Sequence, residues 1–68
     1  MTNSEALKLK PLIDEVEFEY VAPGGQQCRG LVLGLHKNDS GDIIVNILYE
    51  DEDDGFSRKW NCGYLKKV

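Results

Sequence analysis

The sequence predicts an all-β fold, a small five-stranded antiparallel barrel preceded by a short helical segment. Short runs of apolar and β-branched residues alternate with polar residues, which is the pattern of half-buried strands. Turn-forming residues separate these runs at intervals of about eight to fourteen residues. The chain has 68 residues, which suits one domain that buries ~60% of its unfolded surface.

The N-terminal residues carry the weakest pattern. Ser4 can cap a short helix, but the alternation over residues 7–10 is also compatible with a strand. Pro11 ends any helix that continues past it and suits the first turn of a new one. We therefore expect a flexible segment over residues 1–10, then one or two helical turns from Pro11 whose apolar residues pack inward.

Five strands are expected in the remainder of the chain, four of them clear and the last short. They cover residues 16–21, 26–36, 43–49, 56–62 and 65–68. A Pro-Gly-Gly turn joins the first two, because Pro fixes φ and Gly accepts positive φ. Turn clusters follow the second strand and separate the last two.

The second strand is the least regular of the five. Leu31, Leu33 and Leu35 are expected to share one face. Gly30 and Gly34 inside this strand predict bulges or sharp curvature, as closing a small barrel requires. Consecutive strands with short turns pair antiparallel, so residues 11–68 are predicted to form a barrel of the SH3 or Sm type.

Charge and cysteine content restrict the class of protein. Twelve acidic residues against eight basic ones give a net charge of −4, which disfavours nonspecific binding to DNA or to anionic membranes. No apolar run reaches the ~18 residues of a membrane helix. Cys28 and Cys62 are isolated and no secretory signal is present, so we expect two reduced cysteines and a cytoplasmic protein.

Several residues resemble the WYL-domain family. The stretch VEFEY at 16–20, the glycine turn and Arg29 are similar to the opening of that domain. The stretches YED at 49–51, RKWN at 58–61 and LKKV at 65–68 look like its closing part. The similarity covers residues 11–68, although the tripeptide that names the family is absent at 44–46.

The resemblance implies an Sm-like barrel that acts as a regulatory ligand-binding domain, with nucleic acid as a ligand. The helix-turn-helix usually fused to that domain has no room in this chain. By this resemblance Arg29, Arg58 and Trp60 are candidates for ligand contact. Arg58 and Trp60 share one face of a strand and Lys59 lies on the other.

The leading hypothesis is therefore a non-enzymatic module that binds a nucleic acid or other anionic ligand through a basic and aromatic surface. The expected ligand-binding residues are Arg29, Arg58, Lys59, Trp60, Tyr64, Lys66 and Lys67. The competing interpretation makes Trp60 the main core residue of a small barrel, because aromatic residues dominate small cores.

The acidic run between the third and fourth strands supports an alternative function. It consists of Glu50, Asp51, Glu52, Asp53 and Asp54. The run is interpreted as a solvated hairpin tip, as a docking surface for a basic partner or as a cation site, although its spacing differs from a calcium loop. If the run is a docking surface, the protein is a protein–protein interaction module that uses this loop or a strand edge. It would then act as an adaptor or an inhibitor of the kind that a phage or other mobile element encodes.

Catalysis, cofactors and metals have no signature. His36, the single histidine, lies near Asp39 and Ser40 in sequence, but neighbours on one turn do not make a catalytic triad. Phosphate-binding loops, dinucleotide fingerprints and Cys/His metal spacings are absent from the sequence. We expect no enzyme, no cofactor, no metal site and no membrane partner, and a dimer through strand edges is compatible with the sequence.

Overall fold

A computed structural model describes residues 1–13, 15, 17–49 and 57–68. Its elements are α1 (Asn3–Leu7), the 3₁₀ turn η1 (Lys10–Leu12), β1 (Glu17–Val21), β2 (Gln27–Lys37), β3 (Ile43–Tyr49), β4 (Ser57–Asn61), the 3₁₀ turn η2 (Cys62–Tyr64) and β5 (Lys66–Lys67). The strands form one antiparallel sheet in the order β4-β3-β2-β1-β5. The mostly-β class, the antiparallel sheet and the short N-terminal helix are confirmed.

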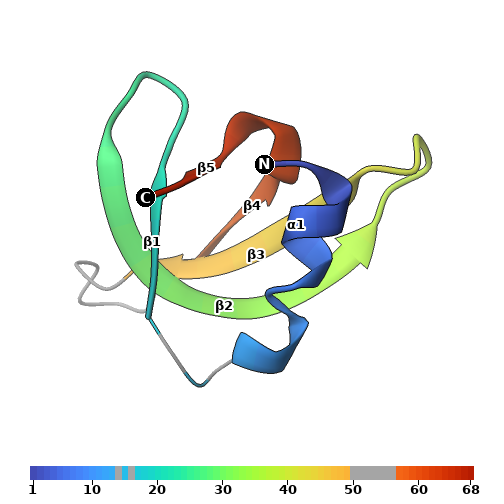
Figure 1. Cartoon of the computed structure of the whole chain (residues 1–68), viewed down its shortest axis with the longest axis horizontal. Helices are drawn as coiled ribbons and strands as arrows, with labels where there is room; N and C mark the ends of the chain where they lie inside the picture. The colour runs from blue at the N-terminus through green and yellow to red at the C-terminus, as the bar shows by residue number, and fades with distance from the viewer. Residues whose placement is uncertain (14, 16, 50–56) are drawn as a thin grey trace.

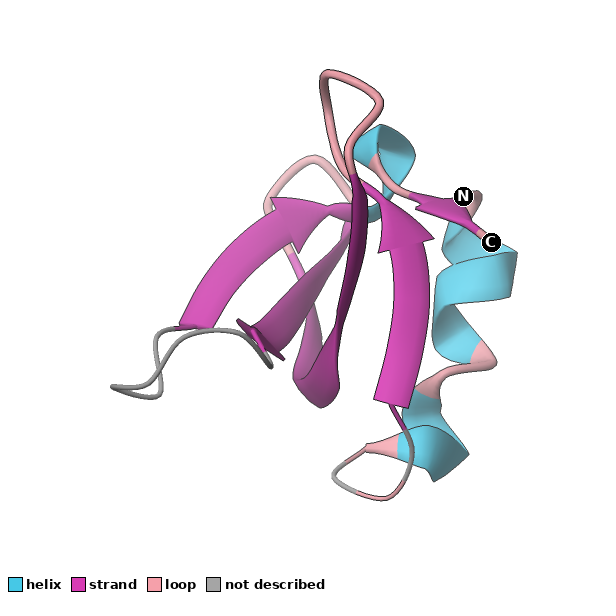
Figure 2. Cartoon of the chain, turned by 90° about the vertical axis from the view of Figure 1, so that its left-hand side faces the viewer, coloured by secondary structure: helices cyan, strands magenta, loops and turns pink. Residues whose placement is uncertain are grey.

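The sheet is strongly curved, and β2 is its longest strand (Figure 1). The helical segment stands along one side of the sheet (Figure 2). The N-terminus lies beside the C-terminal part of the chain, where the Met1 ammonium group donates a hydrogen bond of 2.9 Å to the Cys62 carbonyl oxygen. Among the described residues, no helix has the length and apolar character needed to cross a membrane.

The core lies between the inner side of the curved sheet and the helical segment. Phe18 and Tyr20 of β1 are buried and their rings stack with centroids 5.4 Å apart. Alternate residues of β3 are buried as the sequence predicts. The buried apolar residues are Ala6, Leu9, Phe18, Tyr20, Val32, Ile43, Val45, Ile47, Cys62 and Leu65.

The second strand departs from the predicted pattern. Val32 faces the core opposite Ile47, whereas Leu31 pairs with Leu48 on the other face. The register then shifts by one residue between Val32 and Gly34, so that Leu35 returns to the core side. The prediction that the three leucines share one face is wrong, because a bulge adds one residue and reverses the alternation beyond it.

The N-terminal segment packs on the sheet, where the sequence predicts a flexible segment over residues 1–10. Ala6 and Leu9 are buried, and helix α1 begins at the cap Thr2 rather than at Ser4. The side-chain oxygen of Asn3 accepts hydrogen bonds from the Ile43 backbone at 3.0 Å and from the Cys62 thiol at 3.2 Å. These bonds connect α1 to both the start of β3 and η2.

Candidate ligand-binding site

A cavity of about 270 Å³ lies between the turn that joins β1 to β2 and the adjacent parts of β3 and β4. We call it the aromatic–arginine cavity. Its lining residues are Ala22, Pro23, Gln26, Cys28, Tyr49, Arg58 and Trp60. It contains two of the residues that the sequence predicts for ligand binding, Arg58 and Trp60.

Strand register places these two residues at the cavity. Arg58 lies opposite Ile47 and Trp60 opposite Val45, so both side chains are on the core side of the sheet. Lys59 lies opposite Asn46, on the other face. The predicted separation of Lys59 from its two neighbours is confirmed.

The rings at the cavity are held in fixed positions. The Trp60 indole N–H donates a hydrogen bond of 2.9 Å to the Tyr49 hydroxyl oxygen. The Arg58 guanidinium carbon lies 5.7 Å from the centroid of the Tyr49 ring, within the range of a cation–π contact. Because Trp60 is half-buried and packs against the core, it is both a packing residue and a cavity wall.

Tyr20 places an unusual polar atom next to this cavity. Its side chain is fully buried, and its hydroxyl makes no well-formed hydrogen bond with the described residues, although Tyr49 and Cys28 lie close enough to interact with it. Burial raises the pKa of Tyr20 far above its usual range, and the adjacent Tyr49 and Cys28, two lining residues, raise it further. The Tyr20 and Tyr49 ring centroids are 6.3 Å apart, so the buried Tyr20 ring lies next to a ring that lines the cavity.

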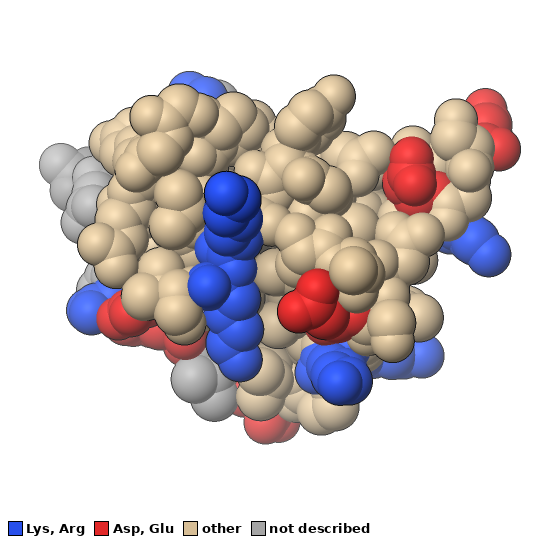
Figure 3. All heavy atoms as spheres, turned by 45° about the horizontal axis from the view of Figure 1, so that its top comes forward, with Lys and Arg blue, Asp and Glu red and all other residues tan. Residues whose placement is uncertain are grey.

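The other predicted binding residues lie elsewhere. Arg29 forms ion pairs with Glu19 at 2.8 Å and with Glu17 at 3.5 Å. Tyr64 is 67% exposed on η2, and Lys66 and Lys67 make up β5, at the opposite end of the sheet order from β4. On the face shown in Figure 3, basic side chains form a narrow column and separate groups with acidic side chains among them. The described residues there form no broad basic surface.

The acidic run at residues 50–54 lies outside the described residues. Its three interpretations therefore stay predictions. Within ranges 1–13, 17–49 and 57–68 and at residue 15, no group of three or more His, Cys, Asp or Glu residues is arranged to hold a metal ion.

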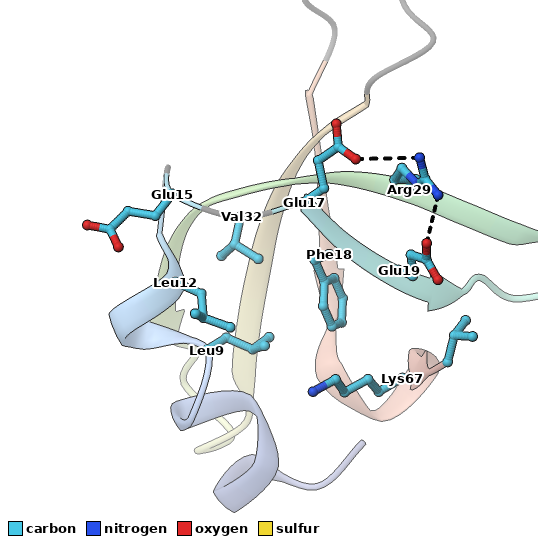
Figure 4. Close-up of a pocket in the computed structure, with 10 residues that line it drawn as sticks. Leu9, Leu12, Glu15, Glu17, Phe18, Glu19, Arg29, Val32 and Lys67 are labelled. Carbon is cyan, nitrogen blue, oxygen red and sulfur yellow. Dashed lines mark hydrogen bonds and ion pairs between the residues drawn. The ribbon is translucent and has the colours of Figure 1, made fainter.

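A second, larger cleft of about 660 Å³ lies between η1 and β1 (Figure 4). Leu9, Leu12 and Phe18 point into it, and the ion pairs of Arg29 lie on its rim (Figure 4). The rim combines acidic and basic side chains, including Glu15 and Lys67. This cleft therefore offers apolar surface without a preference for ligand charge.

Sequence reasoning did not include Tyr49 among the site residues, although the signal was present. Tyr49 is the last inward position of the third predicted strand, and Arg58 and Trp60 alternate inward on the strand paired with it. Pairing these two strands with their inward residues on the same face of the sheet predicts that Tyr49, Arg58 and Trp60 lie close together. Cys28 of β2 and Gln26 of the preceding turn also line the cavity, and strand alternation alone does not predict their position there.

No known family model matches the chain, and comparisons with curated proteins and with solved structures give no match. The resemblance to WYL domains therefore stays a prediction.

Proposed function

We propose that the protein is a non-enzymatic regulatory module, built on a small SH3/Sm-like barrel, that binds single-stranded nucleic acid or a related anionic ligand at the aromatic–arginine cavity. The single observation that carries this proposal is the convergence of Arg58, Trp60 and Tyr49 on one cavity. A guanidinium supplies charge and directed N–H donors for a phosphate, and aromatic rings supply stacking surface for a base.

The strand arrangement supports the barrel. The order β4-β3-β2-β1-β5 places β4 and β5, which the 3₁₀ turn η2 connects, at the two ends of one sheet. The curved β2 pairs with both β1 and β3 and contains a register shift. Bulges of this kind increase local twist and bend, as a small barrel needs.

The size of the cavity restricts the ligand. At about 270 Å³ it lies just below the range of ~300–1,000 Å³ that holds drug-sized molecules. One base or one comparable planar group fits this space better than an extended ligand. The proposal is therefore recognition of one unstacked nucleotide, with Arg58 directed toward its phosphate.

Fluorescence of Trp60, the single tryptophan, tests this proposal. We expect short single-stranded DNA or RNA to change the emission to a saturating value at low salt. Affinity should fall with salt with a slope of about −0.7 per neutralised phosphate in a plot of log affinity against log salt concentration. An unchanged emission at low salt, with circular dichroism showing a folded protein, would contradict the proposal.

A further inference from the structure

A third recess lies beside α1 and η1, near the end of β2 and the beginning of β3. We call it the basic groove. It has a volume of about 310 Å³, and its lining residues are Leu7, Lys10, Ile13, Leu35, His36, Lys37 and Ile43. Because Ile43 begins β3 and Tyr49 ends it, the groove and the aromatic–arginine cavity are at opposite ends of that strand.

The interior of the groove is apolar. Leu7, one of the lining residues, is 52% exposed. Ile13 and Leu35 are half-buried and Ile43 is buried at its base. Apolar side chains from outside could therefore be removed from water here without displacing any residue of the core.

The titratable side chains that line the groove are all of one type. Every titratable side chain that the described residues contribute to its lining is basic, namely Lys10, His36 and Lys37. The ammonium groups of Lys10 and Lys37 form no ion pair with described residues. This local excess of positive charge contrasts with the net charge of −4 and with the mixed rim of the larger cleft.

We propose that the basic groove docks a short acidic segment of a partner protein. One or two apolar side chains of that segment occupy the space beside Leu7 and Leu35, and flanking carboxylates meet Lys10 and Lys37. The charge complementarity identifies the partner as acidic, and complementary potentials of this kind set partner choice and association rate. A recess of about 310 Å³ suits a few side chains rather than the broad surface of a stable dimer.

Selection from a displayed library of random eight-residue peptides tests this inference. The wild-type chain is the bait, and the double variant Lys10→Glu, Lys37→Glu serves for counter-selection. We expect enriched peptides in which Asp or Glu flank Leu, Ile, Phe or Met. A synthetic copy of the most enriched peptide should lose about tenfold in affinity for this double variant.

The matched control is the double variant Lys8→Glu, Lys59→Glu, which makes the same change in net charge with neither residue in the groove lining. It should bind the peptide with less than about a twofold change, since surface charges outside a contact are screened. Methyl NMR signals of Leu7, Ile13, Leu35 and Ile43 should shift on peptide addition. Circular dichroism and thermal melts of both variants establish that each one is folded.

Several results would overturn the inference. These are the absence of enriched peptides, enrichment of neutral or basic peptides, equal weakening in both double variants, and methyl shifts confined to other residues. If sedimentation equilibrium shows a dimer that the double variant Lys10→Glu, Lys37→Glu disrupts, the groove binds a second copy of the chain instead. If the protein binds phosphatidylglycerol vesicles and selects no peptide, the groove binds a lipid surface instead. None of these results bears on Trp60 fluorescence, so the proposed function is tested separately.

Discussion

At the residue scale, Tyr20 combines two roles that oppose each other energetically. Its ring fills the core and stacks on Phe18, while its hydroxyl makes no well-formed hydrogen bond with the described residues. A buried donor without a hydrogen bond costs roughly 1–3 kcal/mol. Tyr20 also lies next to Tyr49, which lines the proposed ligand cavity.

Tyr20→Phe should raise the free energy of unfolding by about 1 kcal/mol, because it removes a buried hydroxyl that makes no well-formed hydrogen bond and keeps the ring. Tyr49→Phe is the matched control. It should lower the free energy of unfolding by about 1 kcal/mol, because Trp60 loses its acceptor. Urea unfolding at neutral pH measures both changes, and a destabilised Tyr20→Phe would show that the hydroxyl has a stabilising partner.

The same residue predicts a dependence on alkaline pH. The unfolded tyrosine ionises near its ordinary pKa of 10.0, whereas burial raises the pKa of Tyr20 in the folded protein. The unfolded state therefore releases the proton first, and the free energy of unfolding falls as pH rises above about 10. Urea unfolding at about pH 8 and about pH 10.5 should show a smaller fall for Tyr20→Phe than for wild type. Equal falls would contradict the buried, neutral phenol.

At the element scale, helix α1 depends on a capping box. The Thr2 hydroxyl accepts a hydrogen bond from the Glu5 backbone at 3.1 Å, and the Glu5 carboxylate accepts one from the Thr2 backbone at 2.9 Å. Hydrogen bonds from Thr2 hold the pKa of Glu5 below its usual range. The Thr-x-x-Glu pattern at residues 2–5 signals this box, and the prediction of a cap at Ser4 is wrong.

Thr2→Ala should lower the free energy of unfolding by about 1 kcal/mol, since it removes an N-cap side chain. Ser4→Ala, two residues further along the exposed helix surface, should change it by less than about 0.5 kcal/mol. Chemical denaturation of the two variants measures the difference. A larger effect from Ser4→Ala would place the start of the helix at Ser4.

Two glycines of β2 differ in what surrounds them. A methyl group added at Gly30 would overlap the Leu48 carbonyl oxygen and come within 2.7 Å of Ile47 Cγ2. At Gly34, nothing lies within 4 Å of the added carbon. Gly30 is therefore required for the close approach of β2 to β3. Gly34 lies just after the register shift, where a larger side chain has room.

Gly30→Ala should lower the free energy of unfolding by about 3 kcal/mol, because backbone atoms of β3 have to move. Gly34→Ala should be neutral or slightly stabilising, because Ala reduces the freedom of the unfolded chain. Thermal melts of the two variants make the comparison. Similar melting temperatures for the two variants would show that β2 and β3 leave room for a methyl group at Gly30.

Parts of the fold were predictable because one physical rule decided them. Alternation along Phe18 to Tyr20 and Ile43 to Ile47 gave the buried faces of β1 and β3. The same rule failed on β2, since one extra residue at a bulge reverses the faces beyond it. Gly34 predicted a bulge or curvature in this strand, but alternation did not show where the faces reverse. Packing of Ala6 and Leu9 was also missed, because burial of a short helix depends on tertiary contacts.

The candidate site was predictable to a similar extent. Arg58 and Trp60 followed from residue type and strand period, and the structure places both at one cavity. Arg29 has the right chemistry, but its strand places it beside Glu17 and Glu19. Residue type identifies candidates, whereas pairing register and sheet curvature decide which of them meet.

At the scale of the whole molecule, two recesses lie at the two ends of β3. The aromatic–arginine cavity combines one cation with rings, and the basic groove combines apolar side chains with three basic residues. Their separation along one strand would allow a ligand at one end and a protein partner at the other. Such an arrangement would suit the proposed regulatory module, since the sheet connects the two contacts.

The most direct test of the proposed nucleic-acid site compares Arg58→Gln with Lys59→Gln. Both substitutions remove one positive charge from adjacent positions of β4, and only Arg58 lies at the cavity. Titration of each variant with the same single-stranded oligonucleotide, followed by Trp60 fluorescence at low salt, should show about tenfold weaker binding for Arg58→Gln. Lys59→Gln should bind as wild type does to within about twofold. Equal affinities for the two folded variants would contradict a site at the aromatic–arginine cavity.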